Sequence, residues 1–402
     1  MSKANAAQRV HNMSEKITGL PRIAYMATPV SFGGAERVSL HFLQHVDRDR
    51  FDIDPILFVR PWEPDNPFAK ELSSLGYHCF TIPVAMSAEE GIFRVVRCLR
   101  NLHQIVRVNS YDLIHTHGYL ADLLGICVAK IARVPVISTC HGFIKGDAKL
   151  SLYNNLDLIA LRYCNKVIAV SDSIKELLAG HAVRTKKISV IENTTPPLVP
   201  GGDASLRRSS KRESLNIGKD DLLLGYLGRL SPEKGIVHLL ESMSMLDSLP
   251  RPVALVIVGD GPQREELQAV VKSNGLENRV IFAGFQQDIR DWLAAIDVFV
   301  LPSVSEGTPM ALLEAMSFGV PCIASAVGGV PRIIDSGVDG ILVSPGKPEE
   351  IRNAICLLGT DTLRRKSISE NARTKISQKY DIKNWARKIE EEYVHVIAAN
   401  RH

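Results

Sequence analysis

Short runs of apolar and β-branched residues alternate with helical patterns along almost the whole 402-residue chain. In the first half we expect strands over 22–27, 51–59, 113–117, 136–139 and 166–170, and a helix over about 35–45. Because helical patterns rather than tight turns separate these strands, neighbouring strands must run parallel. The alternation therefore predicts an α/β fold built from βαβ units.

The alternation is interrupted once, over 194–220, where Pro, Gly, Ser and charged residues dominate. A second series of expected strands follows at 222–226, 255–258, 280–282, 298–301 and 321–324. A chain of this length exceeds one ordinary core. We therefore expect a disordered tail (1–20), a first Rossmann-like domain (21–195), a linker (196–220), a second Rossmann-like domain (221–380) and a C-terminal segment (381–402). An amphipathic helix over 382–399 should pack at the domain junction.

Composition and charge limit the class of protein. The chain is 45% hydrophobic and 23% charged, and its formal net charge is only +4. Residues 1–200 hold 23 Lys and Arg against 18 Asp and Glu, a mild bias that suits an anionic partner, and we expect no nucleic acid to bind. The seven cysteines show no C-x-x-C spacing, which is typical of core thiols in a reducing compartment. Without a signal-like or membrane-spanning run, we expect a cytoplasmic protein, at most peripheral to the inner face of a membrane.

The segment 301–329, LPSVSEGTPMALLEAMSFGVPCIASAVGG, carries the strongest functional signal. A strand ends at Leu301, and after a short loop a helix should begin with Thr308 as N-cap and Pro309 as its first residue. Ligands bind at such carboxyl edges of parallel strands, where loop amides and helix starts hold anions. Glu306 and Glu314 could each reach a hydroxylated group, which is the layout of a sugar and a ribose joined by a diphosphate.

A second loop, after the strand that ends near Gly228, carries two cations, Arg229 and Lys234. Together they suit a diphosphate, because Arg offers a planar fork of donors and Lys a point charge, although surface loops often carry both. The Gly259-Asp-Gly261 turn lacks the full dinucleotide fingerprint and is better interpreted as a tight turn before a helix.

In the first half, Gly33 and Gly34 open a helix directly after the first strand, so they could approach a phosphate or form a plain turn. His141 follows another strand, while His115 and His117 lie at the end of a third. Which of these histidines faces a ligand is left open.

Together these segments resemble the large retaining glycosyltransferase family four, which has the GT-B architecture. The matching motifs are Gly33-Gly34-Ala35-Glu36, His141-Gly142, Gly228-Arg229-Leu230 with Glu233-Lys234-Gly235, Gly259-Asp-Gly-Pro262 and the pair Glu306 and Glu314. The resemblance covers about 21–380 and implies two Rossmann-like parallel-sheet domains with a cleft between them.

The resemblance also implies roles. Arg229 and Lys234 would hold the donor diphosphate, Glu306 the transferred sugar and Glu314 the ribose. The backbone amides of Gly307, Thr308 and Met310 would face phosphate or sugar, Gly33 and Gly34 would border donor and acceptor, and His141 would lie beside the reacting sugar. The donor is expected to be a UDP-sugar and the acceptor a glycan or lipid-linked glycan, with retention at the anomeric carbon and neither metal nor cofactor.

Two positions depart from the family pattern. Arg332 follows Pro331 where the family usually has Glu, and Glu192-Asn193-Thr194-Thr195 replaces an Asn-Gly turn at the end of the first domain.

Other functions remain open. A GT-B-fold sugar-nucleotide epimerase would act on the donor without an acceptor, and a non-catalytic protein would only bind it. A metal-dependent transferase would use Asp-x-Asp, as in Asp47-Arg-Asp49 or Asp52-Ile-Asp54, yet no donor-site pattern surrounds either. A predicted helix with Arg94, Arg97, Arg100 and Arg107 on one broad face is a candidate for contact with an anionic membrane.

Overall fold

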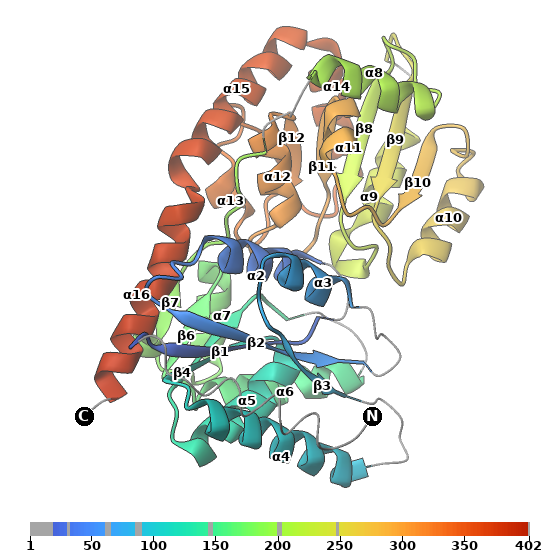
Figure 1. Cartoon of the computed structure of the whole chain (residues 1–402). Coiled ribbons are helices and arrows are strands. Elements are labelled where there is room, and N and C mark those ends of the chain that lie inside the picture. The colour runs from blue at the N-terminus through green and yellow to red at the C-terminus, as the bar shows by residue number, and fades with distance from the viewer. Residues whose placement is uncertain are drawn as a thin grey trace.

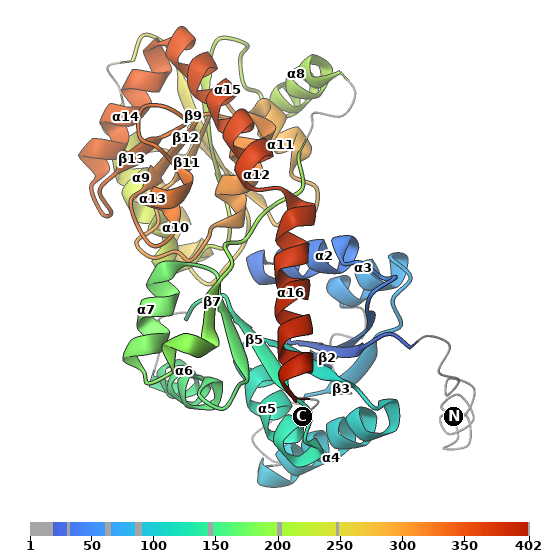
Figure 2. The same ribbon diagram turned by 90° about the vertical axis from the view of Figure 1, so that its left-hand side faces the viewer.

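The computed structural model describes residues 19–29, 33–60, 66–84, 91–143, 148–198, 203–246 and 249–400. Most of the predicted tail, residues 1–18, lies outside this part of the chain. The described residues form two parallel-sheet domains, one above the other in Figure 1. A long helical segment at the C-terminal end runs from the second domain back along the first (Figures 1 and 2).

The first domain is a seven-stranded sheet in the order β3-β2-β1-β4-β5-β6-β7, and all of its neighbouring strands pair in parallel. Its elements are β1 (Arg22–Ala27), α2 (Gly34–His45), β2 (Asp52–Val59), α3 (Pro67–Ser74), β3 (Phe80–Pro83), α4 (Gly91–Asn109), β4 (Leu113–His117), α5 (Tyr119–Ala132), β5 (Val136–Cys140), α6 (Ala148–Leu161), β6 (Lys166–Ala169), α7 (Asp172–Gly180) and β7 (Ile188–Val190).

The second domain is a six-stranded parallel sheet in the order β10-β9-β8-β11-β12-β13. Its elements are α8 (Ala204–Ser214), β8 (Leu222–Leu227), α9 (Ile236–Met243), β9 (Val253–Val258), α10 (Arg264–Ser273), β10 (Val280–Gly284), α11 (Arg290–Ala295), β11 (Val298–Leu301), α12 (Met310–Phe318), β12 (Cys322–Ser325), α13 (Val330–Ile333), β13 (Ile341–Val343) and α14 (Pro348–Thr360). The chain ends with α15 (Thr362–Lys379) and α16 (Ile382–Asn400).

Burial explains why the strands were readable from the sequence. In β1, Ile23 and Tyr25 belong to the core shared with α2 and α16, whereas Ala24 and Met26 face the core under α4 and α5. This alternation follows the two-residue period of a strand covered by helices on both faces. The expected strands agree with the observed ones within about two residues, while the short edge strands β3, β7 and β13 were not expected.

The stretch expected to be a linker contains helix α8. It was missed because it has no apolar period: its one large apolar side chain, Leu206, is exposed. The helix is held by polar contacts instead. Arg208 and Arg212 both pair with Asp297, and the buried Arg212 also donates to the carbonyl oxygens of Gly218 and Asp221.

The C-terminal helix was expected over 382–399, and α16 covers Ile382–Asn400. It packs on α2 and β4 of the first domain, while the preceding α15 packs on α12 of the second. The phenol of Tyr393 lies 2.6 Å from Nδ1 of His115, and Arg50 pairs with Glu390 at 2.7 Å. The last two helices therefore tie the domains together.

Candidate active site

Most of the predicted site residues follow strands at which the two sheets reverse their order. In the first sheet the order turns between β1 and β4, and in the second between β8 and β11. Adjacent crossovers run to opposite faces at such points, which opens a crevice at the carboxyl edge. Gly33 follows β1, Arg229 follows β8 and Glu306 follows β11, whereas His141 follows the neighbouring β5.

Glu306 and Lys234 form the polar centre of the second domain's edge. The ammonium of Lys234 lies 2.8 and 2.9 Å from the two carboxylate oxygens of Glu306, and the hydroxyl of Ser303 donates to Oε1 at 2.7 Å. Only 6% of the Glu306 side chain is exposed. Because Lys carries three donors, the ammonium can engage an anion while it still holds Glu306.

The Glu306 loop rests on two glycines that come from a later turn. The amide of Gly329 donates to the carbonyl oxygen of Gly307 at 2.9 Å. Gly328 has φ +54°, and a Cβ atom there would lie 1.8 Å from the carbonyl oxygen of Glu306. The backbones can approach this closely only because neither glycine has a side chain. The Gly328-Gly329 turn therefore sets the position of the loop that carries Glu306.

The same loop touches the first domain. A Cβ atom on Gly307 would lie 3.1 Å from the carbonyl oxygen of His141, and the hydroxyl of Thr308 donates to the carbonyl oxygen of Val170. The amide of Asn193 adds a hydrogen bond to the carbonyl oxygen of Thr308 at 3.4 Å. Three predicted residues, His141, Gly307 and Thr308, therefore meet at the interdomain junction.

Helix α12 begins one residue later than expected. Pro309 is its N-cap and Met310 its first residue, and Gly319, with φ +90°, ends it. Thr308 does not cap the helix because its hydroxyl is used in the contact with Val170 across the junction.

Glu314 contacts the first domain as well. Nη1 of Arg37 in α2 lies 2.8 Å from Oε1 of Glu314, and 6% of the Glu314 side chain is exposed. Burial raises the pKa of Glu314, and the charge and hydrogen bond of Arg37 act against that rise. Arg37 was not singled out from the sequence, although it directly follows the Gly33–Glu36 motif.

The start of α2 adjoins the start of α12. A Cβ atom on Gly34 would lie 3.8 Å from Cγ of Met310, so these predicted residues are in contact range across the junction. The carboxylate of Glu36 accepts the amide of Gly33 at 3.0 Å, which satisfies one free donor at the helix start.

Arg229 makes no side-chain contact with these residues among those that the structure describes. Its side chain is exposed, and among the described residues it has no ion pair. Its loop packs closely on the backbone of the Gly259–Gly261 turn. A Cβ atom on Gly259 would lie 1.9 Å from the carbonyl oxygen of Gly228, and one on Gly261 would lie 2.3 Å from that of Leu230. The glycines of this turn are therefore explained by packing.

The rings of His115, His117 and His141 lie next to one another in the first domain, with His117 between the other two. His117 Nδ1 is 3.1 Å from His141 Nε2, while His115 Nε2 is 2.8 Å from the hydroxyl of Thr139. Burial lowers the pKa of His115 to about 3 and that of His141 to about 4. Of the three, His141 lies at the Gly307 loop, and His115 and His117 are buried behind it.

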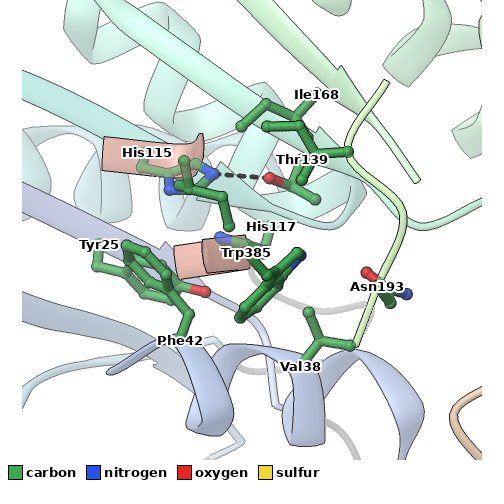
Figure 3. A pocket seen from close by; sticks show the side chains of 11 residues that line it. Tyr25, Val38, Phe42, His115, His117, Thr139, Ile168, Asn193 and Trp385 are labelled. Carbon is green, nitrogen blue, oxygen red and sulfur yellow. Dashed lines mark hydrogen bonds between the residues drawn. The ribbon is translucent and has the colours of Figure 1, made fainter. Parts of the chain in front are cut away.

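A cavity of about 10 Å³ adjoins these histidines inside the first domain, between the sheet, α2 and α16. Figure 3 shows Tyr25, Phe42 and Trp385 around it, with the hydrogen bond between His115 and Thr139. A space of this size holds about one water molecule, so it is no substrate pocket. A larger groove of about 390 Å³ lies between residues 195–198 and α15, away from the predicted site residues.

The two departures from the family pattern meet in space. Arg332 pairs with Asp172 at the start of α7 and, at 3.3 Å, with Glu192. Each departure was visible in the sequence, yet their pairing was not, because 140 residues separate Arg332 from Glu192.

The Asp-x-Asp motifs lie elsewhere. Asp52 and Asp54 pair with Arg22 at the amino ends of β1 and β2, the edge opposite the site. Asp47 binds its own turn through the amide of Asp49. Within the described part of the chain, no three His, Cys, Asp or Glu side chains are grouped as metal ligands would be.

Two family models match the chain. The model described as Glycosyltransferase Family 4 matches residues 32–197, and that described as Glycosyl transferases group 1 matches residues 207–375. With the two parallel sheets, these matches define a glycosyltransferase of the GT-B class. The chain belongs to glycosyltransferase family 4.

Three relatives match this chain over most of their own length. An Escherichia coli UDP-Gal:alpha-D-GlcNAc-diphosphoundecaprenol alpha-1,3-galactosyltransferase is 28% identical over 390 residues, 94% of this chain and 97% of that protein. An uncharacterized glycosyltransferase of Methanocaldococcus jannaschii is 31% identical over 70% of this chain and 75% of its own. The crystal structure of Anabaena HepE with UDP-glucose superposes with a TM-score of 0.77 at 26% identity, over 93% of this chain and 99% of that one.

Proposed function

We propose that this glycosyltransferase moves a hexose from a UDP-sugar to a lipid-linked or growing glycan, with retention at the anomeric carbon and without metal or cofactor. The observation that carries the proposal is the Lys234–Glu306 pair, which lies at the domain edge where His141 meets Gly307. When a cation and an acid lie side by side on two loops, the cation can bind a leaving phosphate and the acid a sugar hydroxyl.

The donor and acceptor classes are supported by the relatives. HepE was crystallised with UDP-glucose, and the name of the Escherichia coli enzyme specifies UDP-galactose and a diphosphoundecaprenol-linked sugar. On this basis Arg229 and Lys234 bind the diphosphate, Glu314 the ribose and Glu306 the transferred sugar. The amides of Gly307, Thr308 and Met310 and the Gly33-Gly34 turn border the donor.

The proposal places the enzyme in the cytoplasm, with α4 in contact with the anionic inner face of a membrane. No helix in the described ranges combines the length and the hydropathy that a membrane crossing needs.

The test is a hydrolysis screen of UDP-, GDP- and ADP-sugars, followed by transfer assays with lipid-linked glycans. We expect UDP-sugar turnover that falls at least 100-fold in Glu306→Gln and in the double variant Arg229→Ala with Lys234→Ala. Matched controls are Glu277→Gln and Lys272→Ala, which are exposed on the same domain. Unchanged turnover in the site variants would contradict the proposal.

Two further readouts address the remaining points. The anomeric coupling constant of the product, measured by proton NMR, should match that of the donor if configuration is retained. A glycosylated acceptor distinguishes transfer from epimerisation, which would yield only an isomerised donor, and activity in excess chelator is expected if no metal takes part.

A further inference from the structure

Three adjacent helices of the first domain carry an unusual number of exposed apolar side chains. Figures 1 and 2 show α4, α5 and α6 together on the face of the first sheet that points away from the second domain. The exposed apolar residues on this layer and at its helix ends are Val95, Val96, Val108, Ile131, Leu152, Leu156, Ile159 and Tyr163. Single exposed apolar residues are ordinary, but a cluster on one face marks an interaction surface.

The cluster is most regular on α6. Leu152, Leu156 and Ile159 follow one another at intervals of four and three residues, so they form one stripe along the helix, and Tyr163 lies in the turn just beyond its end. Their exposed fractions are 55, 40, 45 and 59%. A helix of this length extends over about 20 Å. The stripe is thus a continuous apolar ridge rather than scattered contacts.

The described side chains of this layer carry mostly positive charge. The three helices contain two acidic residues, Asp122 and Asp157, and both are buried. The exposed cations of the helices are Arg97, Arg100, Arg107 and Lys130, and Arg133 and Arg162 follow the ends of α5 and α6. Glu89, Glu90 and Asp147, which precede α4 and α6, lie outside the described residues. A basic rim around an apolar ridge complements an anionic lipid surface, where cations meet headgroups and apolar side chains enter the boundary with the acyl chains.

We propose that the outer face of α4, α5 and α6 docks on an anionic lipid bilayer, with the α6 stripe as its inserted element. A second copy of the chain fits less well, because a two-fold contact would set this basic face against itself. This inference rests on the proposed function, which includes a lipid-linked acceptor. It deepens that function by assigning the surface that contacts the membrane.

The fold links this surface to the candidate active site. Helix α5 follows His117 at the end of β4, and α6 follows His141 after β5, so both helices start at the carboxyl edge of the sheet. Leu152, the first residue of the stripe, is therefore its member closest to the junction along the chain. An acceptor anchored in the same bilayer would reach His141 from the first-domain side.

The first test is flotation of the full chain with vesicles of phosphatidylglycerol and phosphatidylcholine, or of phosphatidylcholine alone. We expect flotation with the anionic vesicles at low salt and its loss at high salt. The triple variant L152Q/L156Q/I159Q should bind at least ten-fold more weakly. The matched control is L206Q/L363Q, which removes exposed leucines, 65 and 82% accessible, from the second domain and its helical extension and should float like the unmodified chain.

The second test separates charge from insertion. R100Q/R107Q should lower the partition coefficient about 25-fold, or about five-fold for each arginine. A tryptophan introduced as L156W should shift its emission to the blue and be quenched by brominated lipid, whereas L206W should show neither change.

Several results would overturn the docking surface. These are no flotation with anionic vesicles, equal losses in the α6 variant and its control, or an unshifted L156W spectrum. Sedimentation velocity provides another: a dimer that becomes monomeric in the α6 variant would assign the face to self-association. Hydrolysis of a soluble UDP-sugar without vesicles tests the transferase separately, so failure of that activity with flotation intact would refute the function and leave the surface standing.

Discussion

Arg37 of the first domain and Glu314 of the second are joined by a hydrogen-bonded ion pair of 2.8 Å, although 277 residues separate them in the chain. The side chain of Arg37 is 18% and that of Glu314 6% exposed, so the pair is largely shielded from water at the junction. Arg37 thus occupies an oxygen of the acid to which we assign the donor ribose. Donor binding would have to share or displace this contact.

Removal of Arg37 should destabilise the protein. Arg37→Ala leaves the buried Glu314 without its cation, which should lower the free energy of unfolding by about 1–3 kcal/mol. The deficit should be larger at pH 8 than at pH 5, because burial raises the pKa of the carboxyl and a larger fraction of the unpaired group is therefore protonated at the lower pH. Urea unfolding measures the effect. The control is Arg207→Ala, which breaks an exposed pair with Asp291 and should lower the free energy of unfolding by less than about 1 kcal/mol. Equal losses in the two variants would contradict a stabilising role of the buried Arg37–Glu314 pair.

The Gly328 turn should matter for turnover. In Gly328→Ala the new methyl group would collide with the carbonyl oxygen of Glu306, so we expect kcat to fall at least ten-fold while circular dichroism still shows a folded chain. Gly275→Ala is a matched control, since Gly275 has a similar φ of +64° but no atom within 4 Å of the added Cβ. It should lose about 1–2 kcal/mol of stability from backbone strain and keep its kcat. If the two variants had the same kcat, the turn would not position the acid.

The ion pairs of Arg332 should help to hold the domains together. Arg332→Glu, which restores the usual family residue, places a third acid beside Asp172 and Glu192 and should separate the domains. We expect a larger radius of gyration by small-angle X-ray scattering and a several-fold loss in kcat/KM, both reduced in high salt. The double variant with Glu192→Arg should recover most of the loss. No recovery would mean that the pairing does not govern domain contact.

Buried histidines should make the protein sensitive to acid. Burial lowers the pKa of His41 to about 4, like that of His141, whereas an unfolded histidine titrates near its usual value of about 6.5. The unfolded chain therefore binds more protons as the pH falls below about 6.5, and each such histidine costs up to about 2 kcal/mol of stability at pH 5. This loss continues until the pH reaches the folded pKa.

Urea midpoints at pH 7 and pH 5 test the contribution of one group. His41→Gln should lose about 1–2 kcal/mol less between the two pH values than the unmodified chain does. His181→Gln, at an exposed position, should follow the unmodified chain. Parallel curves for both variants would show that His41 is not a source of the acid sensitivity.

Local sequence patterns were sufficient to predict the architecture and the secondary-structure positions of part of the candidate site. The alternation of strands and helices determined two parallel sheets, and Leu301, Glu306 and Glu314 were placed correctly because one strand, one loop and one helix carry them. Helix α8 escaped detection because arginines that bind Asp297, rather than an apolar stripe, hold it in place.

The sequence by itself determined which residue types gather at the carboxyl edge of each sheet, since strand period and turn chemistry act over a few residues. Only the tertiary structure decided that Lys234 pairs with Glu306, that Arg37 reaches Glu314 and that α16 returns to His115. The physical reason is that these contacts depend on how two separately formed sheets are oriented. That orientation is set by packing and by ion pairs between segments far apart in the chain, for which a single sequence carries no local signal.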